Sequence, residues 1–350
     1  MVDVFFKKIS YQQLLKEPQV ILDLLEKANF KEKIKKDDLV GIKIHFGERG
    51  NKSFVNPNFL LPLVRYLKNY KTKPFLFDTN TLYYGDRMNA IDHISLAKAH
   101  GFDKLGIPII IGDGLRGNDY VEVEINKKHF KKCYLSFIWK DIDFILCLSH
   151  FKGHMLTGFG GAIKNLGMGI ASRRGKLAQH CEISPYIDKN KCKGCGLCFN
   201  NCPSQCIEKD GDKFCIVSKS CIGCGQCMSL CPLRAIIINW SEAYTLIQER
   251  IVEYAFASLK GKSSIHINFC VFITKECDCM NKEERGYCQD LGVLLSYDPV
   301  ALDKASLDLL IDREKRDIFK EIHPQTPYME QFTYAQEIGL GTTEYRLIEL

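Results

Sequence analysis

The stretch that decides the architecture is KCKGCGLCFNNCP, residues 191–203, which returns 29 residues further on as SCIGCGQCMSLCP, residues 220–232. Each copy contains four cysteines in the order C-x2-C-x2-C-x3-C and is followed directly by a proline. Closely spaced thiolates of this kind are ligands for thiophilic metals. The two copies therefore predict a small module built around bound metal.

The same run is that of the bacterial ferredoxins that hold two iron–sulfur clusters. In that pattern the first three cysteines of a run bind one cluster, and the fourth binds the other. We therefore expect two [4Fe-4S] clusters. One set of ligands is Cys192, Cys195, Cys198 and Cys231, and the other is Cys221, Cys224, Cys227 and Cys202. A pair of zinc sites is the alternative, because C-x2-C is also a zinc spacing, but it gives the third cysteine and the proline no role.

The composition agrees with a redox protein. The chain has 17 cysteines in 350 residues, and no apolar run follows a basic start at its first residues. Thiolate clusters need a reducing compartment, so we expect a cytoplasmic protein of an anaerobe or of a cell with little oxygen. No stretch has the length of a membrane span, and the net charge of +6 is scattered without interleaved aromatic residues. We therefore expect neither a membrane nor a nucleic acid as partner.

Outside the cysteine runs, strand-like and helix-like segments alternate, which predicts an α/β fold with a largely parallel sheet. Strands are expected at residues 38–46, 74–78, 108–111, 120–126, 143–151, 264–273 and 345–350. Helices are expected at residues 58–69, 90–100, 242–259, 299–311 and 330–338. We interpret the chain as one α/β domain, residues 1–183 and 241–350, interrupted by a small α+β ferredoxin-like domain, residues 184–240. Three consecutive domains are the weaker alternative, because the last part has few strands for a core of its own.

A glycine-rich segment, SHFKGHMLTGFGGAIKNLGMG at residues 149–169, follows a predicted strand and leads into a predicted helix. Glycines there let backbone N–H groups approach an anion at the helix start, and Lys164 adds positive charge. The segment matches neither the dinucleotide fingerprint nor the Walker loop, so the anion is not identified. The alternative is a tight turn that packs the helix on the sheet. The candidate residues for binding a cofactor or a small anionic substrate are Gly158, Gly160, Gly161, Lys164, Asn165 and Lys176.

A third group of cysteines is Cys277-Asp278-Cys279, directly after the strand expected at 264–273. Two thiols at i and i+2 point the same way in an extended chain, so they can chelate one metal ion. That strand is expected to neighbour the strand at 143–151, which would bring the thiols close to the glycine-rich turn. A third metal or cluster would need further ligands from elsewhere in the fold. The candidates for that role are His154, His180, Cys181 and Cys288. The alternative is a pair of ordinary buried thiols.

Polar residues also follow the first three predicted strands. Lys43 and His45 end the first strand, Asp78 to Thr81 follow the second, and Asp113 follows the third. Each has an ordinary role as a cap or turn former. Ligands of open α/β sheets bind beyond the carboxyl ends of the strands, so a shared cleft is expected there.

Several motifs are typical of one family. They are GIKIHFGERGN at 41–51, PFLFDTNTLYYGDR at 74–87, the glycine-rich segment, Gly175-Lys176 with His180 following, CDC at 277–279, and LGVLLSYDPVALDKASLDL at 291–309. Together they resemble the uncharacterised iron–sulfur centre proteins grouped as domain of unknown function 362. The resemblance covers nearly the whole chain. It implies the two-cluster architecture and implies that CDC, His154 and His180 belong to the family pattern, but it supplies no substrate.

These features predict an iron–sulfur redox protein whose two clusters relay electrons to a metal or substrate site in the α/β domain. The expected partner is another redox protein, and an acidic ferredoxin fits the mildly basic cysteine module. The alternative is a non-catalytic electron carrier or a binding protein whose clusters are mainly structural. Both an oxidoreductase and a carrier fit the residues.

Overall fold

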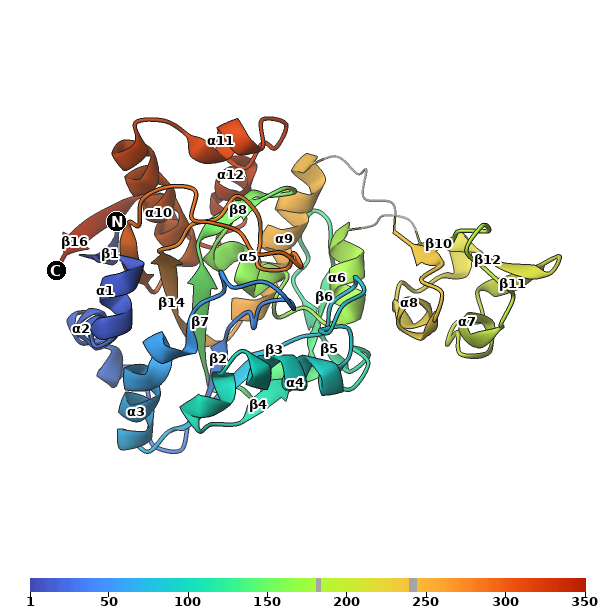
Figure 1. The fold of residues 1–350 in the computed structure, drawn as a ribbon, viewed down its shortest axis with the longest axis horizontal. Coiled ribbons are helices and arrows are strands. Elements are labelled where there is room, and N and C mark those ends of the chain that lie inside the picture. Colours follow the sequence, from blue (N-terminus) through green and yellow to red (C-terminus); the bar gives the residue numbers. More distant parts are fainter. Residues whose placement is uncertain (181–183, 239–243) are drawn as a thin grey trace.

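A central eight-stranded sheet organises the protein, whose computed structural model describes residues 1–180, 184–238 and 244–350 (Figure 1). In spatial order its strands are β16 (Tyr345–Glu349), β1 (Val2–Lys8), β15 (Gly292–Ser296), β14 (Ser263–Cys270), β7 (Phe144–His150), β2 (Leu39–Lys43), β3 (Lys73–Asp78) and β4 (Ile109–Ile111). Every neighbouring pair is parallel except the two pairs that include β15. The predicted α/β fold with a largely parallel sheet is therefore confirmed.

Helices cover both faces of this sheet, which gives three layers (Figure 1). One face packs against α2 (Val20–Lys27), α3 (Leu61–Asn69) and α4 (Ala90–Ala99). The other packs against α5 (Ala162–Gly167), α9 (Tyr244–Leu259), α10 (Pro299–Glu314) and α12 (Glu330–Glu337). The other α-helices of the described α/β domain are α1 (Tyr11–Lys16), α6 (Arg173–His180) and α11 (Ile318–Ile322).

Strand β7 shows why the middle of the sheet has a nearly continuous apolar sequence. Phe144, Leu146 and Leu148 belong to the core on the α2–α3 side, whereas Ile145 and Cys147 belong to the core on the α5–α9 side. All seven residues of β7 are buried. A strand covered on both faces needs apolar side chains at odd and even positions alike.

The residues between 184 and 238, called here the cysteine segment, form elements of their own beside the sheet (Figure 1). These are β10 (Tyr186–Ile187), α7 (Leu197–Asn200), β11 (Ile207–Asp210), β12 (Lys213–Ile216), α8 (Gln226–Leu230) and β13 (Ile236–Ile237). Strand β10 pairs with β13 and β11 with β12. Within the described residues, none of these strands pairs with the central sheet.

Several expectations need adjustment. Strands β1 and β15 were not expected, and the strand expected at 120–126 is β5 (Tyr120–Glu124), which pairs with β6 (Lys132–Ser136) outside the central sheet. Strands β8 (Lys152–His154) and β9 (Gly158–Gly160) form a hairpin inside the glycine-rich segment. Residues 242 and 243 of one expected helix, the domain boundaries at 183/184 and 240/241, and Cys181 fall wholly or partly outside the described residues. No helix among the described residues is long and apolar enough to cross a membrane.

Candidate functional site

A cavity of about 570 Å³ opens at the carboxyl edge of the central sheet. Strand β2 ends at Lys43, β3 at Asp78 and β7 at His150, and all three side chains line the cavity. The loop after β14 adds the CDC residues, 277–279. Because β14 pairs with β7 in parallel, as expected, both strands deliver their following loops to the same edge. The polar ends of the first two predicted strands therefore share a cleft, as expected, but Asp113 after the third strand does not line it.

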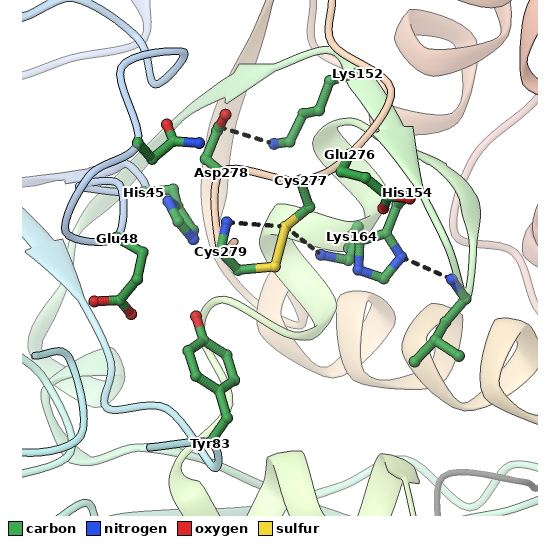
Figure 2. Close-up of a disulfide and its surroundings, with 12 residues drawn as sticks. His45, Glu48, Tyr83, Lys152, His154, Lys164, Glu276, Cys277, Asp278 and Cys279 are labelled. Carbon is green, nitrogen blue, oxygen red and sulfur yellow. Dashed lines mark hydrogen bonds and ion pairs between the residues drawn. A yellow bond between two sulfur atoms is a disulfide. The ribbon is translucent and has the colours of Figure 1, made fainter. Parts of the chain in front are cut away.

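The CDC loop sends its side chains to two sides (Figure 2). Cys277 and Cys279 face the cavity and are joined by a disulfide, with their Cα atoms 5.2 Å apart. Asp278 points toward the end of β7, where its carboxylate lies 3.0 Å from His150 Nδ1 and 3.4 Å from Lys152 Nζ. Burial alone would raise the pKa of Asp278, but His150 and Lys152 outweigh it and hold that pKa well below its ordinary value. The aspartate therefore anchors the loop and leaves both sulfur atoms in the cavity.

His154, at the end of β8, completes a group that could hold a metal ion. A ring nitrogen of His154 and the sulfur atoms of Cys277 and Cys279 all lie within 4.8 Å of one another. Burial first, and the nearby Lys164 second, lower the pKa of His154 well below its ordinary value, so the ring is neutral, as a metal ligand must be. His180 lines the same cavity without joining this group, and Cys288 is not part of it.

Positive charge accumulates on the cavity wall. Lys152, Lys164 and Lys176 all line it. Within the described parts of the chain, Lys164 has no carboxylate partner, and its Nζ lies 4.0 Å from Cys277 Sγ. Burial first, and the neighbouring Lys152 second, lower the pKa of Lys164 to about 7. An anionic ligand would relieve both effects, because it supplies the missing negative charge.

A buried ion network fixes the side chains that line the cavity at the ends of β2 and β3. Asp78 Oδ1 lies 3.0 Å from Lys43 Nζ, and Asp78 Oδ2 lies 3.3 Å from Arg87 Nη1. Arg87 Nε also reaches Glu48 Oε2 at 3.4 Å. Asn165 Oδ1 accepts a hydrogen bond from Lys43 Nζ at 2.8 Å, while its Nδ2 donates to Leu148 O at the end of β7. Asn165 therefore connects helix α5 to the sheet as well as lining the cavity.

The glycine-rich turn does not offer its helix start to a ligand, so that part of the expectation is wrong. The N–H groups of Ala162 and Ile163 donate to the carboxylate of Asp303, at 2.7 and 2.9 Å. The protein thus supplies its own anion there. A Cβ at Gly161 would lie 2.3 Å from Asp303 Oδ1, which explains the glycine as a close-packing position.

The other candidates of that turn have separate places. Gly160 and Gly161 line the cavity, whereas a Cβ at Gly158 would collide with Tyr328. Lys176 Nζ donates to Ala171 O at 2.9 Å and to Thr79 Oγ1. Lys164 and Lys176 therefore remain the candidates for binding an anion, and the turn itself packs the sheet against α10.

In the cysteine segment, the eight spaced cysteines line two separate small cavities. Cys192, Cys195, Cys198 and Cys231 line the first. Cys202, Cys221, Cys224 and Cys227 line the second, together with Cys206. In each cavity the fourth cysteine comes from the other run. This is the interchanged grouping expected from the spacing alone.

The cysteine segment touches the part of the α/β domain that walls the large cavity. Leu82 lines that cavity and also belongs to the hydrophobic cluster of the cysteine segment. Tyr84 Oη donates a hydrogen bond to Met228 O at 3.0 Å, and Met228 directly follows Cys227. Two residues of one loop thus connect the second set of cysteines to the cavity.

Sequence reasoning missed several residues of the cavity. His150, Lys152 and Asp278 were quoted within motifs but received no role. Two signals pointed to them: a histidine ending an otherwise apolar strand, and an acidic residue between two cysteines. Tyr83 also lines the cavity, and no sequence signal marked it.

Comparison with known proteins identifies the family. The model of the Domain of unknown function (DUF362) matches residues 40–308, so the chain belongs to that family. No curated protein matches the chain. The description of this family names no reaction.

Two solved structures are similar in fold. The lactate racemase apoprotein from Thermoanaerobacterium thermosaccharolyticum is 14% identical, with a TM-score of 0.39, over 78% of this chain and 51% of that one. A Thermotoga maritima protein is 10% identical, with a TM-score of 0.44, over 90% of this chain and 60% of that one. The chain thus spans about half to three-fifths of the length of these structures.

Proposed function

We propose that this protein is an iron–sulfur redox protein in which two [4Fe-4S] clusters relay electrons to the cavity of the α/β domain. The observation that carries the proposal is the grouping of the eight spaced cysteines around two cavities, each with one cysteine from the other run. The ferredoxin-like insert, residues 184–240, would hold both clusters, and residues 1–183 and 241–350 would form the domain that receives the electrons.

The residues around the two small cavities fit such clusters. Each cavity is lined by four of the spaced cysteines and by buried apolar residues, Ala235 and Ile236 at the first and Ile207 at the second. Apolar surroundings limit the access of water, which is one of the factors that set a cluster's potential. When bound, [4Fe-4S] clusters supply one-electron transfer at low potential. Cys206 is a further neighbour, because its Sγ lies 3.5 Å from Cys202 Sγ.

Leu82 and Tyr84 support a path from the second set of cysteines toward the cavity. They bring the insert into direct contact with the wall that also contains Tyr83. A carrier that only exchanged electrons with soluble partners would not need this contact. We therefore favour delivery of electrons into the α/β domain.

We further propose that the cavity holds a metal beside an anionic ligand. Two cysteines and one histidine, with a fourth position open, form a donor set known from catalytic zinc sites. His154 Nδ1 accepts hydrogen bonds from the N–H groups of Leu156 and Thr157, both at 3.2 Å, so the neutral ring carries its proton on Nε2. To bind a metal through Nε2, the ring would have to move that proton to Nδ1, where Thr157 Oγ1, 3.0 Å away, would accept it. The disulfide must first be reduced, because only thiolates bind metal. His180 is close enough to the cavity to contact the bound ligand, and Lys164 and Lys176 would bind its negative charge.

A second candidate function rests on the small core of the cysteine segment. Its hydrophobic cluster has 11 buried members, of which Leu82 and Leu177 come from the α/β domain and two are cysteines, and five further cysteines pack against it. Clusters could therefore act mainly as staples of a binding module. In that case electrons would not leave the clusters on a useful timescale.

The proposed partner is a low-potential redox protein with an acidic surface, such as an acidic ferredoxin, in a reducing, cytoplasmic setting. Residues 184–240 contain seven Lys or Arg and four Asp or Glu. Complementary charge would steer the donor to this insert. We propose no nucleic acid or membrane partner.

Anaerobic reduction tests the proposal. Protein purified without oxygen is mixed with a low-potential one-electron donor, and the clusters are followed by absorbance and EPR. We expect reversible uptake of two electrons per chain, and faster reoxidation when a small molecule bound in the cavity is turned over. Clusters that assemble but exchange no electrons would support the staple function instead.

A further inference from the structure

Arg173, the first residue of α6, is buried where the α/β domain meets the cysteine segment. Only 1% of its surface is exposed. Its aliphatic stem packs against Gly225, where an added Cβ would lie 3.0 Å from Arg173 Cγ and 3.1 Å from Cδ. Gly225 directly follows Cys224 in the second cysteine run and has a φ of +69°. Glycine at this position therefore permits the close approach of the arginine.

The guanidinium group of Arg173 is poorly satisfied by the protein. Nη2 donates to Met88 O, but Nε and Nη1 have no hydrogen-bond partner within the described residues. Burial lowers the pKa of Arg173, while Asp113 and Cys224 act in the opposite direction. Burial of a cation with two unpaired N–H groups costs free energy unless an anion lies beside it.

We propose that Arg173 is the charge-compensating residue of the cluster held by Cys202, Cys221, Cys224 and Cys227, and that it gives this cluster the higher reduction potential of the two. The inference rests on the proposed function and adds the direction of electron flow. A [4Fe-4S] cluster with four thiolate ligands is negatively charged and gains one more negative charge on reduction. A fixed cation in a water-poor site favours the reduced form.

Arg173 packs behind Gly225, which lines the second cavity, whereas no described residue that lines the first cavity is a buried cation. Among the described residues of that lining, Lys193 alone is charged, and both Lys193 and Cys195 are exposed. A hydrated surface charge is screened by salt and shifts a potential less. The two clusters therefore differ in their electrostatic surroundings, although their cysteine runs have the same spacing.

This difference orders the electron path. Electrons would enter at the exposed first cluster and move to the second, which is the one connected to the cavity wall through Leu82 and Tyr84. Each step transfers one electron between clusters and needs no proton. The source is the low-potential one-electron donor named above.

A redox titration followed by EPR tests the inference, with Arg173→Gln, Arg173→Lys and Lys209→Gln compared with the wild type. Lys209, an exposed lysine of β11, is the matched control for loss of one positive charge in the same region. We expect Arg173→Gln to weaken reduction of one cluster at least tenfold, which is about 59 mV for one electron. Arg173→Lys keeps the charge and should stay near the wild type, and Lys209→Gln should shift neither cluster.

Three outcomes would overturn the inference. They are unchanged potentials in Arg173→Gln, an equal shift of both clusters, and the same shift in Arg173→Lys as in Arg173→Gln. Iron analysis of each variant accompanies the titration. If Arg173→Gln loses iron, Arg173→Met, which removes the charge and keeps an aliphatic stem, takes its place in the titration. Absence of clusters from the wild type would instead reject the proposed function itself.

Discussion

The α/β domain and the cysteine segment are stabilised in different ways. The α/β domain buries two large apolar cores, one on each face of an eight-stranded sheet. The cysteine segment has two-stranded sheets, short helices and a small cluster to which its own cysteines contribute. It also leaves Leu197, Phe199, Ile222 and Leu233 exposed. Apolar burial is sufficient to fold the first region, whereas under the proposed function the second region would depend on bonds to metal.

Removal of iron should have the largest effect and should separate the two regions. We expect anaerobic chelation to abolish amide protection across residues 184–238 and to leave strands β7 and β14 protected, because a small loop-rich module has too little core without its metal. Hydrogen exchange with mass spectrometry measures this. The reciprocal test is the core variant Leu146→Ala in β7. It should lower the free energy of unfolding of the α/β domain by about 2–5 kcal/mol without loss of iron. Loss of protection in β7 on chelation would contradict the comparison.

Single cysteine changes should remove one cluster at a time. Cys198→Ala and Cys224→Ala should each reduce the iron content from about eight to about four atoms per chain, since each [4Fe-4S] cluster has four iron atoms. The EPR signals that remain should differ between the two variants. Cys215→Ala is the control, because Cys215 lines neither of the two cysteine cavities. Equal loss of both clusters from either variant would show that the two sets are not independent.

The CDC pair should bind metal independently of the cysteine segment. After reduction, wild-type protein should bind one Co²⁺ or Zn²⁺ per chain at Cys277, Cys279 and His154, with a thiolate-to-cobalt absorption band. Cys277→Ser combined with Cys279→Ser should abolish this binding and leave the iron content unchanged. His180→Ala should retain it, because His180 is outside the three-residue group. Wild-type metal content in the double variant would make these cysteines ordinary thiols.

Salt should produce the smallest effect. If the basic cysteine segment receives an acidic donor, the second-order rate of reduction should fall as ionic strength rises, because salt screens surface charge over about 10 Å at 0.1 M. Stopped-flow measurement between low and high salt gives the slope. Lys193→Glu should reduce the low-salt rate more than the high-salt rate. A rate that is independent of salt would remove the argument for an acidic partner.

The sequence predicted the sheet well where strands are long and apolar, as in β7 and β14. It missed β15, because Gly292–Ser296 is short and buried on both faces and so lacks an alternating pattern. It also missed α6, whose sequence RRGKLAQH has few apolar residues. That helix depends on contacts with the rest of the fold, which the local sequence does not show.

For the site, ligand spacing was more informative than glycines. The cysteine spacings predicted which of the eight cysteines line the same cavity, because the residues of each run are close along the chain. The glycine-rich turn suggested an external anion at the start of the helix. The carboxylate of Asp303, 141 residues from Ala162 in sequence, accepts the hydrogen bond of the Ala162 N–H group instead. Such long-range pairing is a property of the packed fold, as is the approach of Arg173 to Gly225.

The most direct test of the central claim is iron and acid-labile sulfide analysis of anaerobically purified wild-type protein, combined with EPR after reduction. We predict about eight iron and about eight sulfide per chain, and two reduced [4Fe-4S] signals. Stoichiometric zinc without sulfide, and no EPR signal on reduction, would contradict the account.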